Sequence, residues 1–168
     1  MTGLQDGQPL SDVVRVAKAS GFTEPDPRDD LNGMDVARKA LILARLSGWR
    51  MELKDVAVES MVPQTMAGLD TAAFMDQLGS LDADMACRLE ETAAAGCRLR
   101  YVASAKDGQL TVGLKAVGPD SALFHLRGTD NLVSVKTKWY DENDLVIQGR
   151  GAGFDATAAG VLADLLSF

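Results

Sequence analysis

Histidine and cysteine are scarce in this sequence, which has one histidine and two cysteines among 168 residues. Cys87 and Cys97 lie ten residues apart, a spacing that matches no common zinc or redox motif. We therefore expect two free thiols in a reducing compartment. His125 has no cysteine or histidine near it in the sequence. These scarcities argue against a zinc site and against a Ser-His-Asp triad, and we predict no metal site.

Excess positive charge and long apolar runs are missing too. A net charge of -7 argues against a nucleic-acid surface, which is normally basic. No apolar run reaches the roughly 18 residues of a membrane span, and the polar first residues lack a signal-peptide core. Aromatic residues make up only 5% of the chain, and we interpret Trp49, Trp139 and Tyr101 as core or interface residues. We expect neither nucleic-acid nor membrane partners.

The composition is that of one soluble domain, residues 1–168, with 46% hydrophobic and 24% charged residues. Apolar periodicity and punctuation by glycine and proline predict five helices and five strands. The helices are expected at 10–20, with Ser11 as candidate N-cap and Gly21 as terminator, and at 34–46, 71–78, 81–95 and 156–166. The strands are expected at 52–61, 98–105, 109–117, 131–138 and 145–148, with 119–126 ambiguous.

The order of these elements favours an α+β fold with a mixed, largely antiparallel sheet and helices packed on one face. The strands cluster in the second half of the chain, where two hairpins are expected. The first is indicated by Asp107-Gly108 between two alternating runs, a strong hairpin signal.

The stretch from Gly21 to Lys39 carries the most unusual chemistry. It contains five carboxylates, and Pro25 and Pro27 push the residues before them toward extended conformations. The carboxylates are Glu24, Asp26, Asp29, Asp30 and Asp35.

Calcium and simple capping are two alternatives for this acidic stretch. An EF-hand is disfavoured because the first and twelfth places of the aligned loop are Arg28 and Lys39. A capping loop would use Asp30 or Asn32, which accounts for one or two acids only. The surplus negative charge indicates a loop arranged to receive a cation, such as a substrate ammonium or a lysine.

Asp35 and Lys39 are four residues apart on the predicted 34–46 helix, so they share one side of it. A plain surface ion pair is one interpretation. At about 100° per residue, however, Arg38 and Arg45 form a separate stripe, which we take as the solvent side. We therefore expect Asp35 and Lys39 to face the protein or a cleft.

A glycine-rich turn lies near the C-terminus. Gly151, Ala152 and Gly153 begin a G-x-G-x-x-A pattern between a predicted strand and a predicted helix, the local context of a dinucleotide fingerprint. Too few residues follow for a complete βαβ unit. The turn either touches a ligand held elsewhere or is a tight strand-to-helix connection.

Four segments together resemble homoserine dehydrogenase, most closely the dehydrogenase part of bifunctional aspartokinase/homoserine dehydrogenases from bacteria and plant-type plastids. They are GFTEPDPRDDLNGMDVARK at 21–39, ALILARLSG at 40–48, LRYVASAKDG at 99–108 and GRGAGFDATAAGVLADLL at 149–166. The resemblance covers essentially the whole chain and is looser at 62–96.

The resemblance implies NAD(P)-dependent interconversion of L-homoserine and L-aspartate 4-semialdehyde, in threonine, methionine and isoleucine biosynthesis. It implies that Lys39 and Asp35 are catalytic and also bind substrate. The other residues it implies for substrate binding are Glu24, Asp30, Gly21 and Thr23. It places Gly151, Ala152 and Gly153 against the nicotinamide.

The family's N-terminal Rossmann domain is not part of this sequence, and Phe22 stands where family members usually have tyrosine. The resemblance therefore implies a substrate-binding and dimerisation domain whose NADP or NAD is bound mainly elsewhere. It also implies a homodimer, a possible fused aspartokinase, and a cytoplasmic location or the plastid stroma of a plant or alga. The alternative is a non-catalytic dimerisation or regulatory module that retains the fold.

Overall fold

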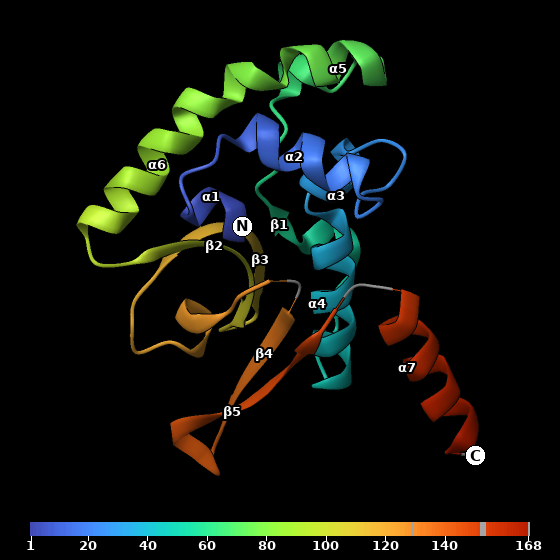
Figure 1. Ribbon diagram of the computed structural model, residues 1–168. Helices are drawn as coiled ribbons and strands as arrows, with labels where there is room; N and C mark the ends of the chain where they lie inside the picture. Colours follow the sequence, from blue (N-terminus) through green and yellow to red (C-terminus); the bar gives the residue numbers. More distant parts are fainter. Residues whose placement is uncertain (129, 152–153, 168) are drawn as a thin grey trace. The chain divides into compact units, whose positions relative to one another are not determined.

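The computed structural model describes residues 1–128, 130–151 and 154–167, and the chain divides into two units (Figure 1). The first unit contains Met1 and Gly3–Ala116, and the second contains Thr2 and Val117–Phe168. Within the described ranges, no helix is both long and apolar enough to cross a membrane. Cys87 and Cys97 are free, as expected.

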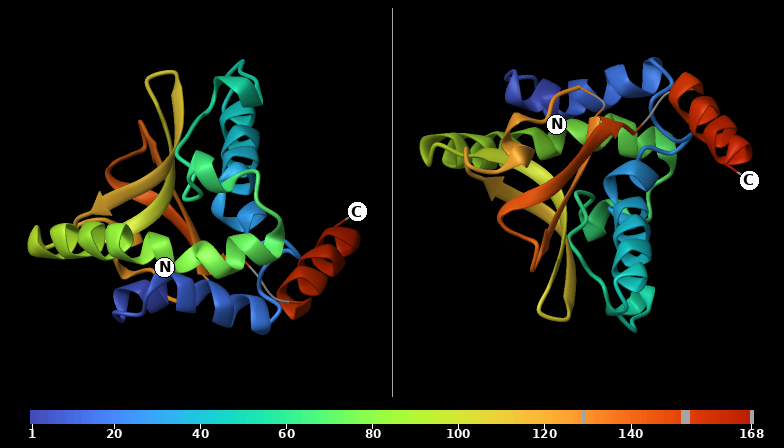
Figure 2. Two further views of the ribbon diagram at one scale, coloured as in Figure 1. Left: turned by 90° about the horizontal axis from the view of Figure 1, so that it is seen from above. Right: turned by 90° about the horizontal axis from the view of Figure 1, so that it is seen from below.

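Helices dominate the first unit. They are α1 (Thr2–Gln5), α2 (Leu10–Ala19), α3 (Arg28–Leu31), α4 (Met34–Leu46), α5 (Thr71–Gln77) and α6 (Asp82–Ala94). Short 3-10 turns connect them: η1 (Leu53–Asp55), η2 (Gln64–Met66) and η3 (Leu78–Leu81). Helix α2 lies beside η3 and α6, which Figure 2 shows in both views. The α1 and α3 helices were not predicted, because four residues are too few to show a helical period.

The ends of α2 show one confirmed and one wrong prediction. Gly21 terminates the helix with a left-handed φ of 72°, which a residue without a side chain adopts at little cost. Ser11 is not the N-cap; Pro9 occupies that position. The Ser11 amide and hydroxyl instead donate to the Asp82 carboxylate at 2.8 and 2.7 Å. A residue at the start of α6 therefore accepts hydrogen-bond donors at the start of α2.

The sheet of the first unit has the strand order β1-β3-β2. Strand β1 (Ala57–Val58) runs parallel to β3 (Gln109–Val117), pairing Ala57 with Thr111. Strand β2 (Arg98–Lys106) joins β3 through the predicted Asp107-Gly108 turn, whose φ values of 50° and 77° suit a type I′ hairpin.

The strand expected at 52–61 is reduced to the two residues of β1. The Asp55 carboxylate accepts the Glu52 N–H at 2.8 Å and closes a capping box around η1, which turns the chain where an extended strand was expected.

Two apolar clusters form the core of the first unit. One centres on Phe74 and Leu78, both fully buried, and includes residues of α2, α6, β2 and β3. The other packs the buried side of α4 against η1, β1 and β3 and consists of Ala37, Leu41, Ala44, Val56, Leu110 and Val112. The second cluster fixes how α4 lies on the sheet and therefore which of its residues point away from it.

The second unit contains a 3-10 turn, η4 (Ala122–His125), a hairpin and helix α7 (Phe154–Leu166). The hairpin strands are β4 (Asp130–Thr137) and β5 (Tyr140–Arg150). Strand β5 begins five residues before the predicted strand at 145–148, because pairing with β4 extends the polar run at its start into the ladder. Trp139 is exposed at the hairpin turn.

The β4–β5 hairpin has one apolar face and one mixed face that carries most of its polar side chains, together with Leu132 and Val146. Val133 lies opposite Ile147 and Val135 opposite Leu145, and all four side chains are exposed. We call these four residues the hairpin apolar face. On the other face, Ser134 donates to the Asp144 carboxylate at 2.6 Å and Gln148 donates to the Asp130 carboxylate at 3.0 Å.

The α+β class is thus confirmed, with mixed and largely antiparallel strands. The strands belong to two sheets rather than one, because β1, β2 and β3 pair among themselves and β4 pairs only with β5 in the described residues.

Candidate active site

The acidic stretch is a folded loop that continues into α3. Pro27 is buried and precedes the first residue of α3. The Asp30 carboxylate accepts the Glu24 N–H at 2.9 Å, which draws the loop back on itself. Asn32 accepts the Met34 N–H at 2.8 Å where α4 begins. Neither predicted residue is the N-cap of α4, which is Gly33: Asn32 accepts the first amide of the helix from one position before the cap, and Asp30 closes the loop.

Arg28 holds this loop on the core. Its Nε donates to both Asp26 carboxylate oxygens at 3.0 Å, and the two side chains form an ion pair. Its Nη1 donates to the Ala67 carbonyl at 3.1 Å and to the Leu69 carbonyl. The guanidinium also lies 5.5 Å from the ring centroid of Phe74. Part of the surplus negative charge thus receives a cation from the chain itself, which the sequence argument did not anticipate.

The Asp26 carboxyl group has a strongly lowered pKa. Hydrogen bonding from Arg28 is the largest cause and brings the pKa from 3.8 to about 2, against a smaller opposing effect of desolvation. The same contact raises the pKa of Arg28. Because the folded pKa lies below the unfolded one, ionised Asp26 contributes stability at neutral pH. That contribution is lost as the pH falls from about 4 to about 2.

We expect Asp26→Asn to remove the loss of folding stability that protonation of Asp26 causes at low pH. The variant will melt below the wild type at about pH 5, and the gap will narrow toward about pH 2 because the wild-type carboxylate is then protonated. Melting temperatures across this range measure the gap. Asp29→Asn, at an exposed position of α3, is the control, and its melting-temperature difference from the wild type should not narrow. A gap for Asp26→Asn that stays constant over the whole range would contradict the assignment.

Lys39 and Asp35 form an ion pair on α4, with Lys39 Nζ 2.7 Å from Asp35 Oδ2. Their side chains are 61% and 65% exposed. Of the two expected surroundings, the protein or a cleft, the first is wrong, because Ala37, Leu41 and Ala44 form the buried side of the helix. An exposed pair adds little to stability. It does leave a primary amine and a carboxylate accessible to a small molecule.

Apolar side chains continue the same side of α4. Ile42 is 57% exposed and Leu46 is 80% exposed, and they follow Lys39 at helical spacings of three and seven residues. An accessible ion pair therefore lies beside accessible apolar surface. Covering this side would desolvate the pair and strengthen its electrostatic interactions.

The remaining predicted substrate residues lie in the loop before α3, except Asp30, which is in α3 itself. Glu24, Asp30 and Gly21 are exposed, and Thr23 is half-buried with its hydroxyl donating to the Glu24 carbonyl at 2.9 Å. Hydrogen bonding connects Asp30 with Glu24, and the ion pair connects Lys39 with Asp35. The left-handed φ of Gly21 also gives this glycine a helix-ending role independent of any ligand.

The predicted cofactor turn is described only in part, since Ala152 and Gly153 lie outside the described residues. A Cβ at Gly151 would overlap the side-chain amide of Asn131, so packing within the hairpin already explains the glycine. One such glycine does not by itself make a dinucleotide site, which also needs a ribose-binding residue. The contact of this turn with the nicotinamide therefore stays a prediction.

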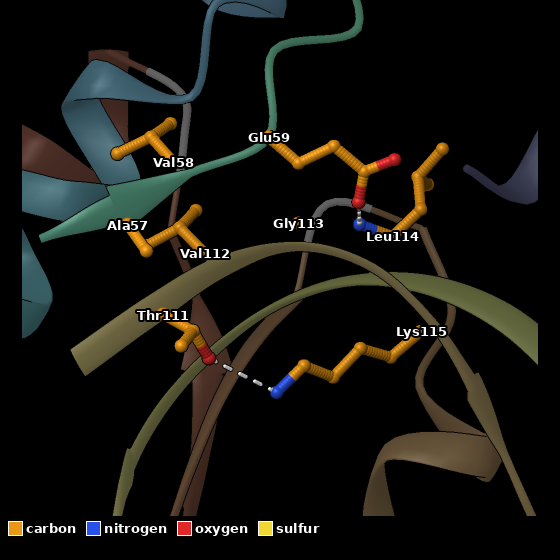
Figure 3. A pocket seen from close by; sticks show the side chains of 8 residues that line it. All are labelled: Ala57, Val58, Glu59, Thr111, Val112, Gly113, Leu114 and Lys115. Carbon is orange, nitrogen blue, oxygen red and sulfur yellow. Dashed lines mark hydrogen bonds between the residues drawn. The ribbon is translucent and has the colours of Figure 1, made fainter. Parts of the chain in front are cut away.

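A shallow pocket lies along β1 and β3 (Figure 3). Its lining residues are Ala57, Val58, Glu59, Thr111, Val112, Gly113, Leu114 and Lys115, and none of the predicted site residues is among them. Across it, the Glu59 carboxylate accepts the Leu114 N–H at 3.2 Å, and Lys115 donates to the Thr111 hydroxyl at 3.3 Å.

Sequence reasoning missed Glu59, which it placed inside a strand. Arg88 of α6 also donates to this carboxylate, at 2.9 Å. The signal that would have found it is Gly113, because a glycine within a strand often marks a close approach by another group. A Cβ there would lie 2.5 Å from Glu59 Oε2.

A sequence profile of the family described as homoserine dehydrogenase matches residues 1–166. The chain belongs to the homoserine dehydrogenase family. A homoserine dehydrogenase from Emericella nidulans is 46% identical over 164 residues, covering 93% of this chain and 45% of that protein. The chloroplastic bifunctional aspartokinase/homoserine dehydrogenase 2 of Zea mays is 46% identical over 162 residues, covering 94% of this chain and 17% of that protein. The chain thus spans less than half the length of these homoserine dehydrogenases.

Solved structures agree on the fold. A crystal structure of a Candida auris protein superposes with a TM-score of 0.88 at 44% identity, covering 95% of this chain and 46% of that one. A putative homoserine dehydrogenase from Archaeoglobus fulgidus gives a TM-score of 0.74 at 24% identity, covering 98% of this chain and 44% of that one. At this lower identity the second likeness concerns the fold alone.

Proposed function

We propose that this chain is the catalytic and dimerisation domain of a homoserine dehydrogenase, which interconverts L-homoserine and L-aspartate 4-semialdehyde. Family membership supports the reaction class, and one observation carries the assignment to this chain. Lys39 and Asp35 form an accessible ion pair at the start of α4, directly after an acidic loop that Arg28 and Asp30 hold in place.

The acidic residues and the lysine have different roles in this proposal. The carboxylates of Glu24 and Asp35 suit the ammonium group that both substrates carry, and Asp30 supports Glu24 through its backbone amide. Lys39 is the proton-transfer group at the reacting oxygen. Its ammonium donates a proton as the aldehyde oxygen becomes a hydroxyl, and its neutral amine accepts that proton in the reverse direction.

NADP or NAD would supply or accept the hydride. A solved hyperthermophilic archaeal homoserine dehydrogenase is in complex with NADPH, with a TM-score of 0.63 to this chain at 24% identity. Because a glycine turn alone does not make a dinucleotide site, we propose that another part of a longer protein holds most of the cofactor. The curated relatives are long enough for such a part.

This assignment is tested by comparing the 168-residue chain with the full-length protein. We expect the chain alone to give no NADPH oxidation above background with aspartate semialdehyde, and the full-length protein to turn over. Absorbance of NADPH measures both. Steady turnover by the chain alone would refute the division of the site. A full-length protein without turnover on either NADPH or NADH would refute the reaction itself.

We further propose that the chain forms a homodimer through the hairpin apolar face. Val133, Val135, Leu145 and Ile147 form a continuous apolar patch on two strands, and a two-stranded hairpin alone is only marginally stable in water. A fused aspartokinase is a property of the bifunctional relatives and is proposed here only for the longer protein. A cytoplasmic or plastid-stroma location is proposed on the same basis.

A further inference from the structure

Glu59 is held in place in the first unit by several independent contacts. Its backbone N–H donates to the Val112 carbonyl at 2.8 Å, continuing the pairing of β1 with β3. Its carboxylate accepts from Arg88 at 2.9 Å and from the Leu114 N–H at 3.2 Å (Figure 3). Close packing of this side chain over Gly113 adds a steric constraint. The Glu59 carbonyl is therefore a fixed acceptor.

Tyr101 of β2 uses that acceptor. Its hydroxyl donates to the Glu59 carbonyl at 2.6 Å, and its ring packs against both apolar clusters of the unit. Burial, with the nearby Glu59 charge, raises the pKa of the Tyr101 hydroxyl, so it stays a donor at neutral pH. The two apolar clusters thus fix the ring of Tyr101, and the Glu59 carbonyl fixes its hydroxyl.

Gly33, the residue before α4, lies directly against this hydroxyl. A Cβ at Gly33 would overlap the Tyr101 oxygen and would come within 3.0 Å of Val58 Cγ1. Its φ of 77° is left-handed. The start of α4 therefore touches Tyr101 so closely that a side chain of any size has no room.

Two further contacts fix the start of α4. The Asn32 side chain accepts the Met34 N–H, and the Met61 N–H donates to the Leu31 carbonyl at 3.0 Å. From Gly33 the helix continues without interruption to Lys39, six residues or about 9 Å further on. A displacement of the first residue is passed along this rigid element to the ion pair.

We propose that Tyr101 is a positioning residue of the reaction: pinned by Glu59 and seated against Gly33, it sets where α4 begins and hence where Asp35 and Lys39 lie. The inference rests on the proposed function of Lys39. Within the described residues, no hydrogen bond or ion pair joins Tyr101 to Lys39 or Asp35. Tyr101 therefore acts on them through the helix. Displacements on the order of 1 Å are enough to cost an enzyme about 100-fold in rate.

The test is Gly33→Ala in the full-length enzyme, with Gly48→Ala as its matched control. Both glycines flank α4 and have left-handed φ, 77° and 89°, but a Cβ at Gly48 meets nothing within 4 Å. Both variants carry the same kind of backbone strain, and only Gly33→Ala pushes on Tyr101. We expect Gly33→Ala to lower kcat by about 10- to 100-fold and Gly48→Ala by less than about 2-fold. Equal kcat values for the two variants overturn the inference.

Tyr101→Phe supplies a rescue and a test that does not depend on Gly33→Ala folding. Alone, it removes the hydrogen bond to Glu59 and keeps the ring, and we expect kcat to fall by about 3- to 10-fold with the melting temperature nearly unchanged. Combined with Gly33→Ala, it removes the overlapping oxygen and should raise kcat above that of Gly33→Ala alone, while the contact with Val58 Cγ1 remains. Wild-type kcat in Tyr101→Phe, or no rescue in the double variant, overturns the proposal.

Lys39→Ala in the same assay distinguishes a failure of the proposed role of Tyr101 from a failure of the proposed function of Lys39. If it abolishes turnover while Gly33→Ala behaves like Gly48→Ala, only the role of Tyr101 is lost. If Lys39→Ala retains turnover, the proposed function of Lys39 is lost, and the role of Tyr101 with it.

Discussion

Lys39→Ala in the full-length enzyme will lower kcat for homoserine oxidation and for semialdehyde reduction by about 100- to 10,000-fold, the usual contribution of a positioned proton-transfer group. The physical reason is that the Lys39 amine is the proposed carrier of the proton at the reacting oxygen. KM should change much less, because the carboxylates that bind the substrate ammonium remain. Steady-state kinetics in both directions measure the two constants.

The melting temperature of Lys39→Ala will stay close to that of the wild type, because the lost ion pair with Asp35 is more than half exposed. Arg38→Ala is the matched control: it removes a neighbouring exposed cation from the same helix and should keep kcat within about 2-fold. A Lys39→Ala enzyme with near-normal kcat and normal assembly would instead support a dimerisation or regulatory module that retains the fold without its chemistry.

Val135→Lys will weaken self-association of the chain by about 100-fold or more. Val135 lies within the hairpin apolar face, opposite Leu145 and two residues from Val133. In a two-fold dimer each copy would bring one unpaired ammonium into the apolar contact. Leaving a buried charge without a partner costs about 3 to 5 kcal/mol, which corresponds to at least a 100-fold change in the dissociation constant. Sedimentation velocity over a range of concentrations measures it.

Val146→Lys is the control for this substitution. Val146 is on the adjacent residue of the same ladder but points to the mixed face, where it lies opposite Ser134. It carries the same loss of strand propensity and the same added charge, and the nearby Asp144 offers the lysine a partner. We expect its association to match the wild type. A monomeric wild-type chain, or equal weakening by both variants, would remove the hairpin apolar face as the dimer contact.

Sequence periodicity was sufficient wherever an element is long and has one buried side. Helix α4 was predicted with the bounds it has, because apolar residues recur along its buried side and Gly48 follows its end. Strands β2 and β3 were also predicted, since a two-residue turn with positive φ marks their junction. Short elements were not: α3 has one helical turn, and β1 depends on a partner strand that the local sequence does not reveal.

In the candidate site too, residues close together in the sequence were predicted and long-range partners were not. The acids and Lys39 were found because they are close together in the sequence. Their partners were not, because the contacts that fix the loop and the helix are long-range: Arg28 donates to the carbonyls of Met66, Ala67 and Leu69, and Tyr101 reaches both Glu59 and Gly33. The helical wheel separated Lys39 from Arg38 but misjudged which side is buried, because small alanines, Ala37 and Ala44, form the contact with the sheet. Alanines carry too little apolar signal to mark a buried side.

The parallel pairing of β1 with β3 joins Ala57 and Val58 to strand residues far along the chain, with α5 and α6 in between. Closing so long a loop costs conformational entropy before any contact compensates for it, whereas the β2–β3 hairpin closes over two residues. On refolding, the hairpin and the helices can therefore form first and the β1 ladder last. Glu59 follows that ladder directly, so the acceptor for Tyr101 would be put in place only in the final stage of folding.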